Sequence, residues 1–284
     1  MIIPQWARRI AGPFIVAMML SPGTSNAAAN PVLTVTIGDE TRTFSRDALL
    51  ARPDVTDIDI PADIAYGKPM RFRAIPLAKL LAQFRAPEGS VIESVAVDGF
   101  AAHLPLDLVM NTDPAKPIAW LAIEPAGAPW PPLPGKPSSA GPFYIVWTGA
   151  IANTISSEQW PYQLARLESQ LSPLARWPQL AVDPALPAAH DARAGQALFI
   201  TQCLPCHMLD GAGSSDVGPD LNRPMSPTAY MTHAGLHALI RDPKAVRSWP
   251  AQIMPGFAAD QMSDRDIDAV IAYLAHMADR KAAR

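Results

Sequence analysis

The sequence predicts an α+β domain of mixed sheet and short helices, followed by an all-α domain. From Pro31 to about Glu168, short β-branched runs alternate with turn residues, which is typical of strands. From Asp191 onward, apolar residues recur at helical spacing. Between them, residues 169–190 are rich in proline and alanine, which predicts a semi-rigid linker. The 284 residues suffice for two ordinary domains.

The first 27 residues predict a signal peptide that is not part of the fold. Arg8 and Arg9 form a short positive region, and residues 10–20 form an apolar run too short for a permanent membrane span. Ser25-Asn26-Ala27 offers small residues for cleavage after Ala27. We therefore expect a periplasmic protein whose mature form has no membrane span. An uncleaved N-terminal anchor is the alternative.

The domain at residues 31–168 is expected to be a sheet with short helices. Runs of apolar and β-branched residues predict strands at 32–37, 57–60, 94–97, 102–104, 119–123 and 143–147. Ser45 is expected to cap a short helix that ends at Leu50, and residues 75–84 have helical apolar spacing. Residues 124–142, dense in proline, predict a long surface loop.

The strongest chemical motif is Cys203-Leu204-Pro205-Cys206-His207, which contains both cysteines of the chain. Two thiols three residues apart, followed by a histidine, are the attachment signature of a c-type haem. Each thiol can add to one vinyl group, and His207 can then bind the iron, so one motif predicts one haem c per chain. A zinc site would need more ligands of this kind, and a redox dithiol has no need of the histidine.

Three further segments of the C-terminal region resemble class I cytochrome c. Residues 191–199 look like the first helix of that family, and Gly218-Pro219-Asp220-Leu221 resembles its haem-edge loop. Met254-Pro255-Gly256-Phe257 resembles the loop that supplies the sixth ligand. The resemblance implies an all-α cytochrome c domain over residues 191–281. It also implies covalent haem attachment outside the cytoplasm, which agrees with export.

By the same resemblance, the Pro219 carbonyl would accept the second ring N–H of His207, which fixes the tautomer. The resemblance also places an aromatic residue, Tyr273, against the first helix. The final helix is marked by Ser263 at its start and by an apolar stripe, namely Ile267, Val270, Ile271 and Leu274.

The iron would need a sixth ligand, for which the sequence offers several methionines and histidines: Met208, Met225, Met231, Met254, Met262, Met277, His233, His237 and His276. Met254 precedes Pro255-Gly256 in a loop between helical segments, from which a side chain can reach across the ring. Together with the resemblance, this makes Met254 the expected axial partner of His207. A thioether ligand raises the reduction potential.

Other polar residues of this region have two interpretations each. His233 and His237 would share one helix face, where they could bind a metal or simply form a polar surface. Arg247, Trp249 and Tyr230 could donate hydrogen bonds to haem carboxylates, or could be ordinary surface and core residues.

The N-terminal domain has a looser resemblance. Residues 44–50, 75–81 and 97–106 follow the order of elements in the sulfite-oxidase-type molybdopterin-binding domain. That family holds molybdenum through a cysteine, and this domain has none. The resemblance therefore implies the fold without the cofactor. The sequence alone shows no paired arrangement among the histidine and carboxylates of the domain: His103, Glu93, Asp98, Asp107 and Glu124. We expect the domain to dock the haem domain onto an electron donor.

The net charge of −3 and the absence of a basic block argue against a nucleic-acid partner. We expect an electron carrier without catalytic residues, which accepts single electrons from a periplasmic dehydrogenase and passes them to another cytochrome or a terminal oxidase. The alternative is a fused haem-containing oxidoreductase, similar to sulfite dehydrogenases, with an active N-terminal domain. A haem sensor with a labile Met254 and a structural subunit of a larger dehydrogenase are further alternatives.

Overall fold

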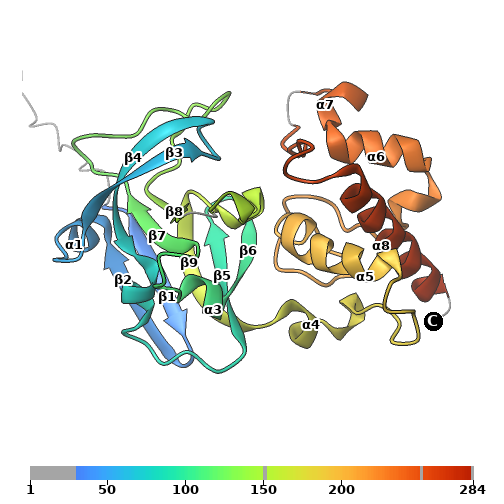
Figure 1. Ribbon diagram of the computed structural model, residues 1–284, viewed down its shortest axis with the longest axis horizontal. Coiled ribbons are helices and arrows are strands. Elements are labelled where there is room, and N and C mark those ends of the chain that lie inside the picture. Colours follow the sequence, from blue (N-terminus) through green and yellow to red (C-terminus); the bar gives the residue numbers. More distant parts are fainter. Residues whose placement is uncertain (1–29, 150–151, 250–251, 283–284) are drawn as a thin grey trace, which may run out of the picture.

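The computed structural model describes residues 30–149, 152–249 and 252–282. The expected signal peptide lies outside these residues. Within them, buried hydrophobic side chains form two separate clusters, one over residues 33–167 and the other over residues 180–277. Figure 1 shows the first as a strand-rich body and the second as a helical body. We call these two bodies the N-terminal part and the C-terminal part.

Two sheets build the N-terminal part. One has the order β2-β1-β9-β5-β6 and the other the order β3-β4-β7-β8. All pairings are antiparallel except that of β1 with β9. The strands are β1 (Val32–Ile37), β2 (Glu40–Ser45), β3 (Thr56–Asp63), β4 (Lys68–Pro76), β5 (Ser90–Ala96), β6 (Ala101–Pro105), β7 (Ile118–Ile123), β8 (Phe143–Thr148) and β9 (Leu164–Leu171).

Short helices connect these strands: α1 (Arg46–Leu50), α2 (Leu77–Leu81) and α3 (Leu106–Val109), with the 3-10 turns η1 (Ala152–Thr154) and η2 (Ser157–Gln159). The expected cap is present, because the Ser45 side chain accepts a hydrogen bond from the Ala48 N–H. The N-terminal part is therefore mostly sheet with short helices.

The helix expected over residues 75–84 is shorter than its apolar spacing indicates. Ile75 and Pro76 end strand β4, and Ile75 pairs with Leu121 of β7. The prediction was wrong for these two residues, because pairing with β7 takes their backbone into the sheet. Only Leu77–Leu81 remain helical.

Residues 169–190 begin inside strand β9 and then pack on the C-terminal part. They form α4 (Pro173–Arg176) and the 3-10 turn η3 (Pro178–Leu180). Leu180 is fully buried in the second cluster, and its carbonyl accepts a hydrogen bond from Tyr273 Oη at 2.7 Å. The proline-rich segment is thus a packed connection rather than a free tether.

The C-terminal part is built of helices: α5 (Asp191–Leu198), the π-helical turn η4 (Phe199–Cys203), the 3-10 turn η5 (Pro227–Ala229), α6 (His233–Arg241), α7 (Pro243–Val246) and α8 (Asp264–Ala282). An isolated bridge pairs Leu209 with Ala212, so the region is not purely helical. None of the helices in the described ranges is long and apolar enough to cross a membrane.

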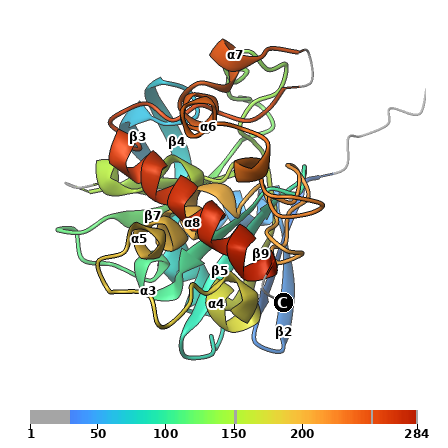
Figure 2. The same cartoon turned by 90° about the vertical axis from the view of Figure 1, so that its right-hand side faces the viewer.

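Helices α5 and α8 lie side by side at close range (Figures 1 and 2). Gly195 sits at the contact, where a Cβ atom would overlap the backbone of Ala269. One turn further, the rings of Phe199 and Tyr273 lie 5.3 Å apart between centroids. These contacts set the first half of α8 against the end of α5, from which the cysteine motif continues.

Candidate haem site

The cysteine motif leaves helix α5 through the π-helical turn η4, which ends at Cys203. The chain then folds back on itself, because His207 N–H donates to the Cys203 carbonyl at 2.9 Å and Cys206 N–H donates to the same carbonyl at 3.1 Å. Both thiols are free rather than joined in a disulfide. Two thiols and an imidazole are therefore gathered on one tight turn.

The surroundings keep these groups uncharged. Burial raises the pKa of Cys203 to about 12 and that of Cys206 to about 12, and the nearby Glu158 carboxylate adds to both shifts. Burial also lowers the pKa of His207, although the contact with Pro219 partly opposes this. A neutral imidazole is the form that ligates metals.

A loop beneath the motif orients His207. Gly218 N–H donates to the Cys206 carbonyl at 2.7 Å, and His207 Nδ1 lies 2.8 Å from the Pro219 carbonyl oxygen. A Cβ atom on Gly218 would overlap the imidazole ring, so only glycine lets the loop lie this close. Donation from Nδ1 leaves Nε2 as the atom that can bind iron. The contact implied by the resemblance is present, while the roles at the iron stay predictions.

Met254 lies in the loop between α7 and α8. Its side chain is partly buried and packs against the hydrophobic cluster of the C-terminal part. The next two residues, Pro255 and Gly256, line the same cavity as Cys206. The structure therefore brings the Met254 loop and the cysteine motif to the borders of one cavity.

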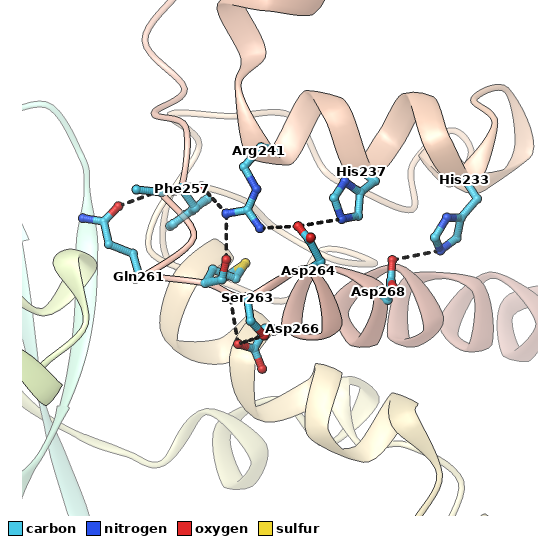
Figure 3. A network of polar contacts seen from close by, with 11 residues as sticks. His233, His237, Arg241, Phe257, Gln261, Ser263, Asp264, Asp266 and Asp268 are labelled. Atoms are coloured by element: carbon cyan, nitrogen blue, oxygen red, sulfur yellow. Dashed lines mark hydrogen bonds and ion pairs between the residues drawn. The ribbon is translucent and has the colours of Figure 1, made fainter.

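Arg241 anchors the chain that follows Met254 (Figure 3). Its Nη1 donates to the Phe257 carbonyl at 2.5 Å and to the Met262 carbonyl at 2.7 Å, and its Nη2 donates to Asp264 Oδ1 at 2.7 Å. This side chain ties helix α6 to both ends of the segment between Phe257 and α8.

The two histidines of α6 face carboxylates of α8. His237 Nε2 lies 3.4 Å from Asp264 Oδ1, and His233 Nε2 lies 3.4 Å from Asp268 Oδ1 (Figure 3). Among the described residues, no group of three or more His, Cys, Asp or Glu side chains could hold a metal ion. The histidine pair thus supports the packing of α6 on α8.

The residues considered as donors to haem carboxylates lie at the surface. Tyr230 is 65% exposed and Trp249 is 48% exposed. The Arg247 guanidinium lies over the Trp249 ring, 5.7 Å from its centroid. The structure does not gather these three side chains in a buried site.

A cavity of about 380 Å³ lies between the two parts. Cys206, Val217, Pro255 and Gly256 line it from the C-terminal part. Cys203, His207 and Met254 do not line this cavity themselves, so the cavity lies beside the group of haem-binding candidates. The residues of the region fit a c-type haem: two free thiols, an imidazole with Nδ1 already bonded, and a methionine loop whose next residues border the same cavity as Cys206. Such a group would supply an iron that takes up and releases single electrons.

The N-terminal part contributes residues to this region that the sequence did not indicate. Glu158 and Trp160 line the cavity, and Ser156 Oγ donates to Gln202 Oε1 at 2.7 Å. No local signal marks these residues, because they belong to a connection between β8 and β9 and meet the motif only through the fold.

Among the N-terminal carboxylates singled out in the sequence, Glu93 is the centre of a contact between the two parts. Glu93 on β5 is 3% exposed and accepts hydrogen bonds from Arg176 of α4 and from Ser214 Oγ of the C-terminal part. His103 Nε2 lies 3.2 Å from Glu93 Oε1. We call this group the Glu93 cluster. Glu124 has another structural role, since it accepts a hydrogen bond from the Trp130 N–H at 2.7 Å.

The pKa of Glu93 reflects these contacts. Burial alone would raise the pKa, but the contacts with His103 and Ser214 and the charge of Arg176 outweigh it and lower the pKa to about 2. Glu93 is therefore ionised throughout the neutral range, and its charge is compensated within the cluster.

Comparison with known proteins identifies one part of the chain. Residues 192–278 match the family model described as Cytochrome c, which covers less than half of the chain. No curated protein matches the chain. The resemblance of the N-terminal part to the sulfite-oxidase-type domain receives no support from these findings.

Proposed function

Given that residues 192–278 form a cytochrome c domain, we propose that this chain is an exported electron carrier with one covalently bound haem c. The observation that carries the proposal is the tight turn that gathers Cys203, Cys206 and His207 within the matched domain. The proposed donor is a periplasmic dehydrogenase, and the proposed acceptor is another cytochrome or a terminal oxidase. Such redox encounters are weak and bury little surface.

Each site residue has a proposed role. Cys203 and Cys206 hold the haem through thioether bonds, and His207 binds the iron through Nε2. Pro219 keeps the imidazole in the orientation that this bond requires, and its contact with Nδ1 supports the assignment. Met254 would provide the sixth ligand. A haem held by these residues would supply an iron that exchanges single electrons and leaves no open position for a substrate.

We further propose the division into a signal peptide (1–27), an α+β domain (31–168), a linker (169–190) and a mainly helical class I cytochrome c domain (191–281), with the boundary between the α+β domain and the linker moved to Leu171, where β9 ends. The two separate hydrophobic clusters support two domains. The proposed mature protein is periplasmic and spans no membrane.

Covalent haem can be tested by producing the chain in a bacterium that matures c-type cytochromes. Mass spectrometry should give the mass of residues 28–284 plus one haem, and elemental analysis should give one iron and no molybdenum per chain. Replacing Cys203 and Cys206 together by Ala should abolish the added mass. A purified chain without haem would refute the proposal, and stoichiometric molybdenum would favour the fused oxidoreductase.

The sixth ligand can be tested with a matched pair of methionine variants. The ferrous protein should resist carbon monoxide, and Met254→Leu should bind it because one axial position opens. Met225 is 54% exposed and serves as the control, so Met225→Leu should behave as the unchanged protein. Equal behaviour of the two variants would exclude Met254 as the ligand.

A further inference from the structure

We propose that the N-terminal part forms one wall of the haem site, with Trp160 facing the haem beside Cys206. The inference rests on the proposed haem attachment and goes beyond it. In this arrangement, the haem edge held by Cys206 borders protein on the side of the N-terminal part and is shielded there from water.

The first argument is that the N-terminal part binds the cysteine motif itself. Ala101 N–H at the start of β6 donates to the Pro205 carbonyl at 3.0 Å, inside the motif. Ser156 Oγ, just before η2, donates to Gln202 Oε1 directly before the motif. Two contacts from two elements therefore hold the turn that carries both cysteines.

The second argument is the lining of the cavity. The N-terminal part contributes Phe100, Glu158, Trp160 and Tyr162 among others, while the C-terminal lining includes Cys206 and the residues on both sides of Met254. Because Cys206 borders the cavity, a group attached to its sulfur borders it as well. The cavity is of the size usual for ligand sites and has mainly aromatic and apolar walls on the side of the N-terminal part.

The third argument is the place of Trp160 in the lining. Trp160 is 5% exposed, and its indole ring borders the cavity. Its Nε1–H has no hydrogen-bond partner among the described residues, but this atom has almost no accessible surface and does not open into the cavity. A group attached to Cys206 would therefore meet the apolar part of the indole ring.

The charge of the wall formed by the N-terminal part agrees with a haem beside it. Although Glu158 retains some accessible surface, burial raises its pKa to about 7, and a hydrogen bond from Ser157 only partly opposes this. Glu158 is therefore only partly ionised near neutral pH, and the other charged residues of the N-terminal lining, Asp98 and Lys136, are of opposite sign. Exclusion of water disfavours the more highly charged ferric state, so this wall is expected to raise the reduction potential.

The Glu93 cluster fixes the wall in place. Glu93 belongs to the N-terminal part, Arg176 to the connection and Ser214 to the segment after the motif. A buried carboxylate shared by three segments resists sliding of one part over the other. The wall thus has a defined orientation toward the cavity.

The direct test is nuclear magnetic resonance of the full-length haem protein with ¹⁵N-labelled tryptophan. The indole signal of Trp160, identified by its loss in Trp160→Phe, should shift or broaden between the ferrous and ferric states because unpaired spin lies nearby. Trp120 does not line the cavity, and its Nε1 donates to Thr148 Oγ1 at 2.8 Å, so its indole is the internal control. A change at Trp160 no larger than that at Trp120 would overturn the proposal.

A second test changes the charge of the wall. Glu158→Lys places a positive charge at the cavity and should raise the midpoint potential of the haem in an equilibrium redox titration. The control is Glu88→Lys, at an exposed position away from the cavity, which should leave this potential nearly unchanged. Equal shifts in the two variants would contradict the proposed wall. If the chain carries no haem absorption at all, the haem attachment fails instead, which separates the two conclusions.

Discussion

Replacing Glu93 by Gln should destabilise the protein by about 3 kcal/mol at pH 7. Glu93 is 3% exposed, and Arg176 Nη1 lies 3.2 Å from each of its carboxylate oxygens. The neutral amide of Glu93→Gln keeps the size of the side chain but removes the charge that balances Arg176. It also places an NH₂ group where the cluster needs an acceptor.

The magnitude follows from the pKa of Glu93, which falls from an ordinary value of 4.5 to about 2 in the folded protein. Each pKa unit corresponds to about 1.4 kcal/mol, which gives about 3 kcal/mol for the ionised side chain. Because Arg176 is 34% exposed, water screens its charge and this value is an upper estimate. A lowered carboxyl pKa stabilises the fold above pH 4.5, and this stabilisation is lost as the pH falls toward 2.

The assay is guanidinium unfolding of the haem protein at pH 7 and pH 3, followed by far-ultraviolet circular dichroism for the sheets and by haem absorption for the helical part. Glu93→Gln should lose about 3 kcal/mol at pH 7 and about half of that at pH 3. The control is Glu40→Gln, whose carboxylate pairs with Arg42 at the surface and is 46% exposed, so its loss should stay below about 1 kcal/mol. A loss for Glu93→Gln that matches the control, or that does not depend on pH, would refute the reasoning.

Three further substitutions test the site and its support. Gly218→Ala should displace the His207 ring and so allow carbon monoxide to bind the iron in its place. The control is Gly127→Ala, which should have no effect on carbon monoxide binding because no atom lies within 4 Å of its Cβ position. Gly195→Ala should lower the unfolding free energy by about 1–3 kcal/mol in a thermal melt, and an unchanged melting temperature would disprove the close helix contact. Arg241→Met should free the chain after Met254, so the ferric absorption band of methionine-bound haem should disappear at a lower temperature than in the unchanged protein.

Several strands could be predicted because their own residues determine them. β1, β7 and β8 consist of apolar and β-branched residues that the sheet buries, so their local pattern and their environment agree. β4 was missed, and its last two residues were assigned to a helix. β2 and β9 were missed for the opposite reason. β2 is a polar edge strand, and only Leu164 and Leu167 are buried in β9, whose place between β1 and β5 depends on partners far away in the sequence.

The same distinction applies to the site. Haem attachment requires residues that are close together in the sequence, so the motif from Cys203 to His207 can be recognised in a short stretch of sequence. Trp160, Glu158 and the Glu93 cluster carry no such signature. They lie close together because the fold brings one connection of the N-terminal part next to the segment after the motif. No sequence pattern predicts this tertiary contact.

The hydrogen bond from Ala101 to the Pro205 carbonyl has a consequence for biogenesis. An enzyme that attaches the proposed haem would have to reach both thiols. In the closed arrangement, the N-terminal part contacts Pro205 within the motif and Gln202 directly before it, and Cys203 and Cys206 are only partly exposed. If the chain carries the proposed haem, these contacts favour its attachment before the two parts close on each other.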